Sequence, residues 1–125
     1  MKKKAGYVAA VFTAVLALVI GPAVAATADA SANYYNGGYL RSSAYYNASK
    51  DRASTTDERN DGWGSRVRWE LNAGGGGSKD DINGAGSTDY GYPSFGSSNK
   101  IRIKSGSVNN GVHIGDGAFS GWVNI

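Results

Sequence analysis

Residues 64–71, GSRVRWEL, alternate strictly between small or apolar side chains and charged ones. The first set is Ser65, Val67, Trp69 and Leu71, and the second is Arg66, Arg68 and Glu70. Residues 100–104, KIRIK, repeat this pattern, with Ile101 and Ile103 between three cations. A period of two is typical of a β-strand that buries one face and exposes the other. We therefore expect both segments to be strands, with Val67, Trp69, Ile101 and Ile103 shielded from water.

The rest of the chain also favours strands and turns over helices. It is rich in glycine, serine, asparagine and tyrosine, and no stretch has helical periodicity. Asn110-Gly111 between two valines predicts a hairpin. Further strands are expected at 39–47, 52–56, 88–92 and 118–125, the last with Phe119, Trp122 and Ile125 as core residues. We predict an all-β fold, a small antiparallel β-sandwich or barrel of about five to seven strands.

The N-terminus has the layout of a secretory signal peptide. A lysine cluster, an apolar stretch and a small-residue cleavage site follow one another at 2–4, 8–20 and 23–25. The apolar stretch is shorter than the ~20 residues that a membrane-spanning helix needs. We expect residues 1–25 to be removed, with cleavage after Ala25 or Ala26 and a second site at Ala32. The protein is then secreted and extracellular, without membrane contact after cleavage.

The remaining chain is long enough for one domain. Residues 26–38 are small and polar, and we expect them to form a flexible N-terminal lead. Residues 39–125 are predicted to be a single β domain. Within it, residues 72–99 contain GGGG and few aliphatic side chains, which predicts a long glycine-rich loop.

Charge and cysteine content restrict the partners and the source of stability. The full chain has 13 Lys and Arg against 10 Asp and Glu, but removal of Lys2, Lys3 and Lys4 leaves ten of each. A near-neutral protein gives no reason to expect nucleic-acid binding. The chain has no cysteine, so sheet pairing and aromatic packing must replace the disulfides of many small exported domains.

The side chains that catalysis requires are few. His113, the one histidine, lies between Val112 and Ile114 and is expected at a surface or sheet edge. A zinc site needs several such ligands, and no GxSxG motif occurs. The acidic residues of the turns are expected to be solvated: Asp57, Glu58, Asp61, Asp80 and Asp81. We predict no enzyme, no cofactor and no resident metal, with a loose calcium site among these carboxylates as the alternative.

Nine residues are candidates for a binding face. The cations are Arg66, Arg68, Lys100, Arg102 and Lys104, and the tyrosines are Tyr45, Tyr46, Tyr90 and Tyr92. If residues 64–71 and 100–104 share a sheet, the cations could attract an anionic wall polymer, the alternative being that they only keep the protein soluble. Neighbouring tyrosines face opposite sides of a strand, so one of Tyr45 and Tyr46 should be exposed. Exposed tyrosines with Ser, Gly and Asn are typical of binding surfaces, including carbohydrate-facing ones, whereas buried ones would cover the core.

Two stretches resemble known groups of proteins. DGWGSRVRWEL together with SSNKIRIKSGSVNNGVHIGDGAFSGWVNI is similar to a loose group of small secreted actinomycete β-sandwich proteins of unknown function. Many of those proteins have a cysteine pair in the last strands, which this chain lacks. GGYLRSSAYYNASKDRAS resembles the start of lactococcin-type bacteriocins, small exported β-sandwich proteins, without the histidines of their motif. The second resemblance implies an antimicrobial activity.

These observations favour a secreted non-enzymatic binding protein that acts at or outside the cell envelope. Its partner would be a cell-wall polymer or another secreted protein. One alternative is a bacteriocin-like protein or a subunit of a secreted toxin assembly, in which residues 26–38 add a strand to a partner's sheet. Another is a protease inhibitor with residues 72–99 as the bait loop, although four consecutive glycines are not rigid.

Overall fold

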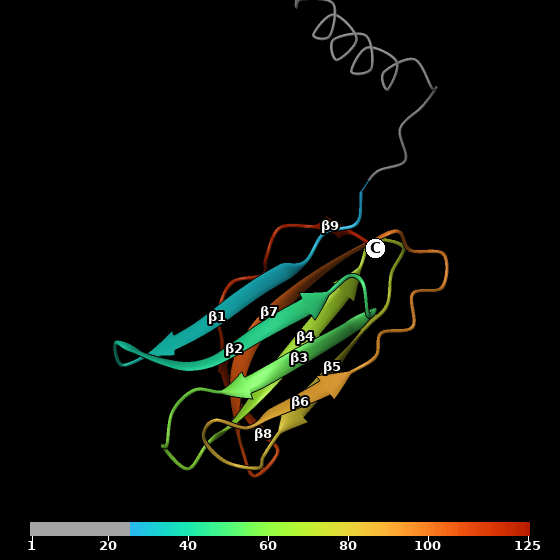
Figure 1. The fold of residues 1–125 in the computed structure, drawn as a ribbon. Helices are drawn as coiled ribbons and strands as arrows, with labels where there is room; N and C mark the ends of the chain where they lie inside the picture. The colour runs from blue at the N-terminus through green and yellow to red at the C-terminus, as the bar shows by residue number, and fades with distance from the viewer. Residues whose placement is uncertain (1–25) are drawn as a thin grey trace, which may run out of the picture.

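The protein is seen in a computed structural model that describes residues 26–125. The predicted signal peptide, residues 1–25, lies outside the described residues. The described part contains nine strands and no helix, and the strands form two antiparallel sheets that pack against each other (Figure 1). The prediction of an all-β sandwich is therefore confirmed. Among residues 26–125, no helix is long and apolar enough to cross a membrane.

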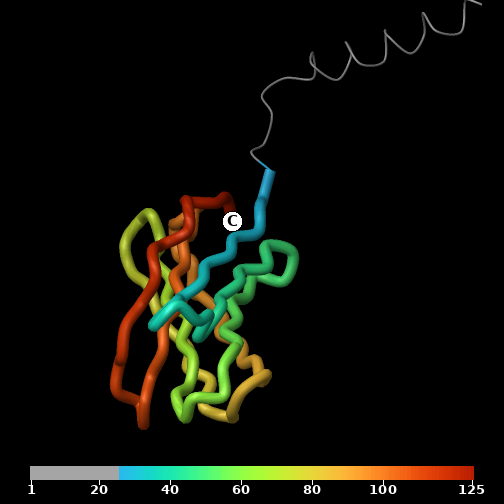
Figure 2. The backbone as a smooth tube through the Cα atoms, turned by 90° about the vertical axis from the view of Figure 1, so that its left-hand side faces the viewer, coloured from blue at the N-terminus to red at the C-terminus, as the bar shows by residue number. Residues whose placement is uncertain are grey.

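The first sheet, sheet A, has the strand order β1-β2-β3-β6. Its strands are β1 Ala30–Asn36, β2 Tyr39–Asn47, β3 Arg52–Asp57 and β6 Thr88–Gly91. The second sheet, sheet B, has the order β5-β4-β7-β8, and β9 also pairs with β7. Its strands are β5 Gly76–Asp81, β4 Gly64–Leu71, β7 Lys100–Asn109, β8 Val112–Asp116 and β9 Val123–Asn124. Figure 2 shows the two layers from the side, with the C-terminus close to the start of β1.

The apolar half of the interior is built by the alternating strands. Val67, Ile101 and Ile103 are completely buried and Trp69 is 8% exposed, as the alternation predicts. The facing side chains of sheet A are Ala44, Tyr46 and Ala53. Burial of these groups removes apolar surface from water, which is the main favourable term for a chain without disulfides.

The other half of the interior is polar, and hydroxyl groups join the two sheets there. Ser42 Oγ of β2 lies 2.7 Å from Ser105 Oγ of β7 and donates to the Gly106 carbonyl at 2.8 Å. Thr55 of β3 donates to Ser65 of β4 at 2.8 Å. All four hydroxyl-bearing side chains are fully buried. Because each hydroxyl has a partner, their burial does not leave an unsatisfied polar group.

Two acidic residues belong to this polar end, so the prediction of solvated turns is wrong for Asp57 and Asp81. Asp57 is 2% exposed and Asp81 is fully buried. The Asp81 carboxylate accepts hydrogen bonds from Asn83 N at 2.9 Å and Ser87 Oγ at 2.7 Å. Burial raises the pKa of Asp57, although the Arg59 amide donates to its carboxylate. These carboxylates hold the loops that follow β3 and β5.

Strand β1 occupies Ala30–Asn36, where the sequence predicts a flexible lead. It pairs with β2 from Ala30 opposite Tyr46 to Asn36 opposite Tyr39. Ala30 and Tyr34 of this strand are both buried, so β1 is packed into the sandwich along its length. The prediction of a flexible lead is therefore wrong for residues 30–36, because pairing with β2 and burial of two of its side chains order this segment.

Residues 72–99 likewise contain β5 as well as the expected short strand β6, instead of one long loop. Pairing with β4 and β3 forms these strands, and the Trp69 ring fits between a glycine of each. A Cβ at Gly77 of β5 would lie 2.5 Å from Trp69 Cζ2, and one at Gly91 of β6 would lie 2.9 Å from Cη2. Glycine at both positions thus makes room for the indole at this edge of the sandwich.

The C-terminal segment only partly follows the prediction. The hairpin at Asn110-Gly111 is present, with φ of 52° and 78° at these residues. Residues 118–125 are expected to form a strand, but only β9 is a strand, and Trp122 is 43% exposed. Phe119 is half-buried and also lies outside the core, whereas Ile125 packs against the core as predicted. The segment instead runs along β7, where the Ser120 amide donates to the Ile103 carbonyl at 2.7 Å.

Candidate binding surfaces

The nine predicted binding residues do not form one surface. Strands β4 and β7 are neighbours, so the five cations do share the outer face of sheet B. Tyr45 and Tyr90 lie on the outer face of sheet A, on the opposite side of the sandwich. Tyr46 lies between the two sheets and is fully buried. The prediction that Tyr46 belongs to a binding face is therefore wrong. Tyr92, 67% exposed, follows β6.

Most cations of sheet B are paired with carboxylates on the same face. Arg66 bonds to Asp80 with a shortest distance of 2.6 Å, and this contact raises the pKa of Arg66. Two further pairs are Arg102–Glu70 at 2.6 Å and Lys104–Asp116 at 3.0 Å. The Lys100 ammonium donates to Asn124 Oδ1 at 2.7 Å. Within residues 26–125, Arg68 is the one member of this set with neither an ion pair nor a side-chain hydrogen bond.

Aromatic side chains of the C-terminal segment cover part of this face. The Arg102 guanidinium lies 4.3 Å from the centre of the Phe119 ring and 4.7 Å from that of Trp122. The Lys104 ammonium is 4.7 Å from the Phe119 ring centre. Cation–π contacts thus use Phe119 and Trp122 on the outside of sheet B. The sequence predicts these rings in the core because they are apolar. It does not show that Arg102 and Lys104 lie next to them in the fold.

Asp116 connects the last strands electrostatically. Burial raises the pKa of its carboxyl, but the contacts with His113 and Lys104 outweigh this effect, and the net shift of the pKa is downward. His113 Nε2 lies 3.0 Å from Asp116 Oδ1, and the His113 side chain is exposed on β8, an edge strand of sheet B. In the part of the chain that the structure describes, no three His, Asp or Glu side chains gather closely enough to hold a metal ion.

The outer face of sheet A carries two rows of uncharged side chains that cross its strands. In the first row, Ser54 of β3 is opposite Tyr45 of β2 on one side and Tyr90 of β6 on the other. We call Tyr45, Ser54 and Tyr90 the tyrosine row. Tyr45 is 41% exposed and Tyr90 is 40% exposed, so both rings meet solvent. The next row is formed by hydroxyl side chains: Ser43, Thr56 and Thr88.

Neighbouring groups hold both rings of the tyrosine row in place. The Tyr45 hydroxyl donates to the Asp29 carboxylate, which also accepts from the Ala48 amide at 2.8 Å. This contact raises the pKa of Tyr45 and lowers the pKa of Asp29. The Arg52 guanidinium lies 4.1 Å from the centre of the Tyr90 ring. The two exposed rings are thus positioned by specific contacts and not by burial.

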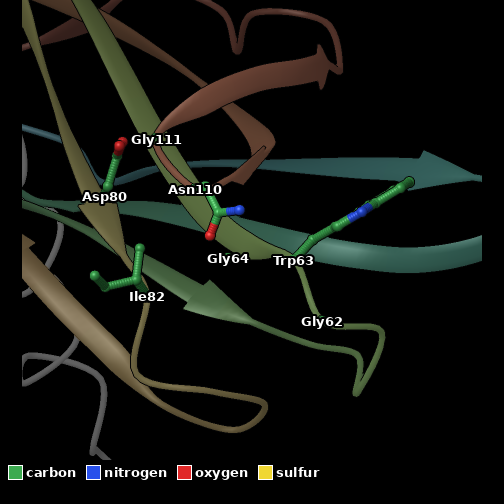
Figure 3. A pocket seen from close by; sticks show the side chains of 7 residues that line it. All are labelled: Gly62, Trp63, Gly64, Asp80, Ile82, Asn110 and Gly111. Atoms are coloured by element: carbon green, nitrogen blue, oxygen red, sulfur yellow. The ribbon is translucent and has the colours of Figure 1, made fainter.

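A hollow of about 410 Å³ lies at the polar end of the sandwich, beside the β7–β8 hairpin (Figure 3). Its lining combines the exposed Ile82 with Asn110, Asp80 and three glycines, while the Trp63 ring points away from the other labelled side chains. The Asp80 carboxylate is already bonded to Arg66. The lining therefore offers a ligand the amide of Asn110 and apolar surface. It contains no pair of side chains that could act as acid and base.

No family model, no curated protein and no solved structure matches this chain. The resemblances to small secreted actinomycete proteins and to lactococcin-type bacteriocins therefore stay predictions.

Proposed function

We propose that the protein is a secreted, non-enzymatic binding protein that contacts its ligand with the outer face of sheet A, at or outside the cell envelope. The observation that carries this proposal is the tyrosine row, with two solvent-exposed rings that neighbouring groups hold in place. Tyrosine supplies a large contact area with few rotatable bonds, so little conformational entropy is lost on binding. A surface that is already ordered binds more tightly for the same contacts.

The cationic face of sheet B supports binding less well. Three of its five cations have carboxylate partners on the same face, and aromatic rings cover Arg102. An anionic wall polymer would have to displace these partners or bind mainly through Arg68 and Lys100. Strand donation by the N-terminal residues is also less well supported, because Ala30–Asn36 already pairs with β2.

Co-sedimentation of the purified protein with isolated cell envelopes tests the proposal. We expect the wild-type protein to sediment with the envelopes and a Tyr45→Ala, Tyr90→Ala variant to stay in solution. An Arg68→Ala variant, changed on the opposite face, should sediment like the wild type. Circular dichroism would establish that all three proteins have the same fold. A wild-type protein that stays in solution even at low ionic strength would contradict the proposal.

A further inference from the structure

The chemistry of the tyrosine row and its surroundings also indicates what kind of ligand it fits. We propose that this ligand is an extended, uncharged polysaccharide chain that lies across the strands of sheet A; this inference rests on the proposed function. The row could in principle meet a protein, an anionic polymer or a neutral glycan. Three properties of the surface favour the last of these: the separation of the rings, the hydroxyl groups beside them and the state of the nearby charges.

The separation of the two rings fits alternate sugar units of an extended chain. Tyr45 and Tyr90 are on β2 and β6, with β3 between them. Neighbouring strands are about 4.8 Å apart, so the two backbone positions are separated by roughly 10 Å. Two consecutive pyranose units of an extended chain together span a similar length, so the two tyrosines would stack on every second unit. Because Ser54, the residue between the tyrosines, is small, nothing rises between the two rings to interrupt a flat ligand.

The side chains around the row match both surfaces of a sugar. The aromatic ring offers an apolar face to the C–H groups of a pyranose, and the phenol offers a polar edge. Next to the row, Thr56 and Thr88 share a hydrogen bond of 2.7 Å between their hydroxyl groups. A hydroxyl is a donor and an acceptor at once, so each can still bond to a sugar hydroxyl. The Arg52 guanidinium lies over one face of the Tyr90 ring, and its N–H groups add donors for the oxygens of a sugar that contacts the rest of the ring.

The charged groups near the row are engaged within the protein, except for Arg52, which stacks on the Tyr90 ring and keeps its N–H donors available. The Asp29 carboxylate accepts from Tyr45, and the Glu58 carboxylate accepts from Ser43 Oγ at 2.5 Å. Arg41 pairs with Asp61 at 2.8 Å. An ionic ligand would compete with these contacts and would bind in a strongly salt-dependent way. An uncharged ligand leaves all of them intact, which is why we choose a neutral glycan over an acidic polymer or a charged protein surface.

The test is a binding series with insoluble polysaccharides. Purified protein is mixed with cellulose and with chitin as uncharged extended polymers, and its affinity for soluble pectate is measured as the anionic comparison. We expect binding to at least one uncharged polymer that changes little between low and high ionic strength, and no binding to pectate. Tyr45→Ala and Tyr90→Ala should each weaken that binding by about tenfold.

Matched variants separate the row from other exposed groups. Tyr35 is 61% exposed and lies outside the row, so Tyr35→Ala should bind like the wild type. Tyr90→Trp keeps an aromatic face and should retain most of the affinity. Binding to pectate alone, lost in Arg68→Ala, would overturn the assignment to a neutral glycan. Capture by cell envelopes that depends on Tyr45 and Tyr90, without binding to either uncharged polymer, would overturn the ligand class and leave the proposed function standing. If neither the polymers nor the envelopes capture the protein, both proposals fail.

Discussion

Tyr45 and Tyr46 are neighbours in the chain and have opposite environments. Tyr46 is completely buried, packs edge-on against Phe95 with 6.4 Å between ring centres, and donates to Asp51 at 3.3 Å. Tyr45 points to the other side of β2 and reaches Asp29. The alternation of a strand requires that the two rings separate. It does not say which one is buried, because both faces of residues 39–47 carry aromatic groups.

Burial of Tyr46 predicts a loss of stability at alkaline pH. Burial first, and then the nearby Asp51 carboxylate, raise the pKa of Tyr46 from 10.0 to about 12. The unfolded phenol therefore loses its proton at a lower pH than the folded one. The stabilisation by Tyr46 is complete below pH 10 and disappears as the pH rises through about 12, a change of roughly 2 to 3 kcal/mol.

Urea unfolding of wild-type and Tyr46→Phe proteins at several pH values would measure this effect. We expect the free energy of unfolding of the variant to decrease less between pH 10 and pH 12 than that of the wild type. Tyr35→Phe is the control for the loss of an exposed hydroxyl. Parallel pH profiles for wild type and Tyr46→Phe would contradict the assignment.

At the scale of single strands, β5 illustrates how packing overrides composition. Its sequence, GGSKDD, begins with two glycines, which by themselves disfavour a strand because glycine loses much backbone freedom. The strand forms because it pairs with β4 over its whole length. Gly77 is opposite Trp69 in that pairing, and only a residue without a side chain leaves room for the indole there.

A methyl group at Gly77 should therefore destabilise the protein. In Gly77→Ala the new Cβ would lie 2.5 Å from Trp69 Cζ2, and Gly91 restricts the ring from the β6 side. We expect a loss of about 1 to 3 kcal/mol in the free energy of unfolding, typical of overpacking. Gly121→Ala is the matched control, since no atom lies within 4 Å of its Cβ position. Equal denaturation midpoints for the two variants would show that the indole moves aside at little cost.

For the molecule as a whole, the contact between the two sheets replaces the missing disulfides. One half of the contact is apolar, and the other half is a set of buried hydroxyl groups that bond from sheet to sheet. Such bonds stabilise modestly when complete, whereas loss of one partner leaves a buried polar group unsatisfied. The hydroxyl pairs therefore also favour one relative position of the sheets over others.

The Ser42–Ser105 pair allows a direct test of this view by a double-mutant cycle. Ser42→Ala should destabilise the protein by about 1 to 3 kcal/mol, because the buried Ser105 hydroxyl then has no partner. Ser105→Ala should cost less, about 0.5 to 1.5 kcal/mol, because Ser42 still donates to the Gly106 carbonyl. The double variant should lose less than the sum, with a coupling of about 0.5 to 1.5 kcal/mol. Ser31→Ala, at an exposed position of β1, is the control and should change stability little. Strict additivity in urea denaturation would mean that the pair contributes no coupling.

The sequence predicted the strands whose patterns are local. Residues 39–47 and 64–71 form β2 and β4 with the expected bounds, and the Asn110-Gly111 hairpin is present. Strands β1 and β5 were not predicted, because their small residues and glycines do not form an alternating pattern of polar and apolar side chains. Their formation depends on Tyr46 and Trp69, which lie on other strands and provide the surface against which they pack.

The candidate site likewise combines features that could be predicted from the sequence with contacts that only the fold reveals. The exposure of one tyrosine from the 45–46 pair and the outward row of cations follow from alternation, and both could be predicted. The ion pairs that engage three of the cations, and the stacking of Phe119 and Trp122 on Arg102, join residues from different strands. No spacing in the chain reveals such contacts, because β-pairing brings together segments that are distant in sequence.

By itself, the sequence determined that this chain forms two-faced strands and which side chains of the alternating segments 64–71 and 100–104 are buried. That is a local property, since successive side chains of a strand point to opposite sides. Only the tertiary structure decided that the tyrosines and the cations lie on opposite faces, and that Tyr45, Ser54 and Tyr90 form one row. The physical reason is that the order and register of strands depend on packing between the sheets, to which all strands contribute at once.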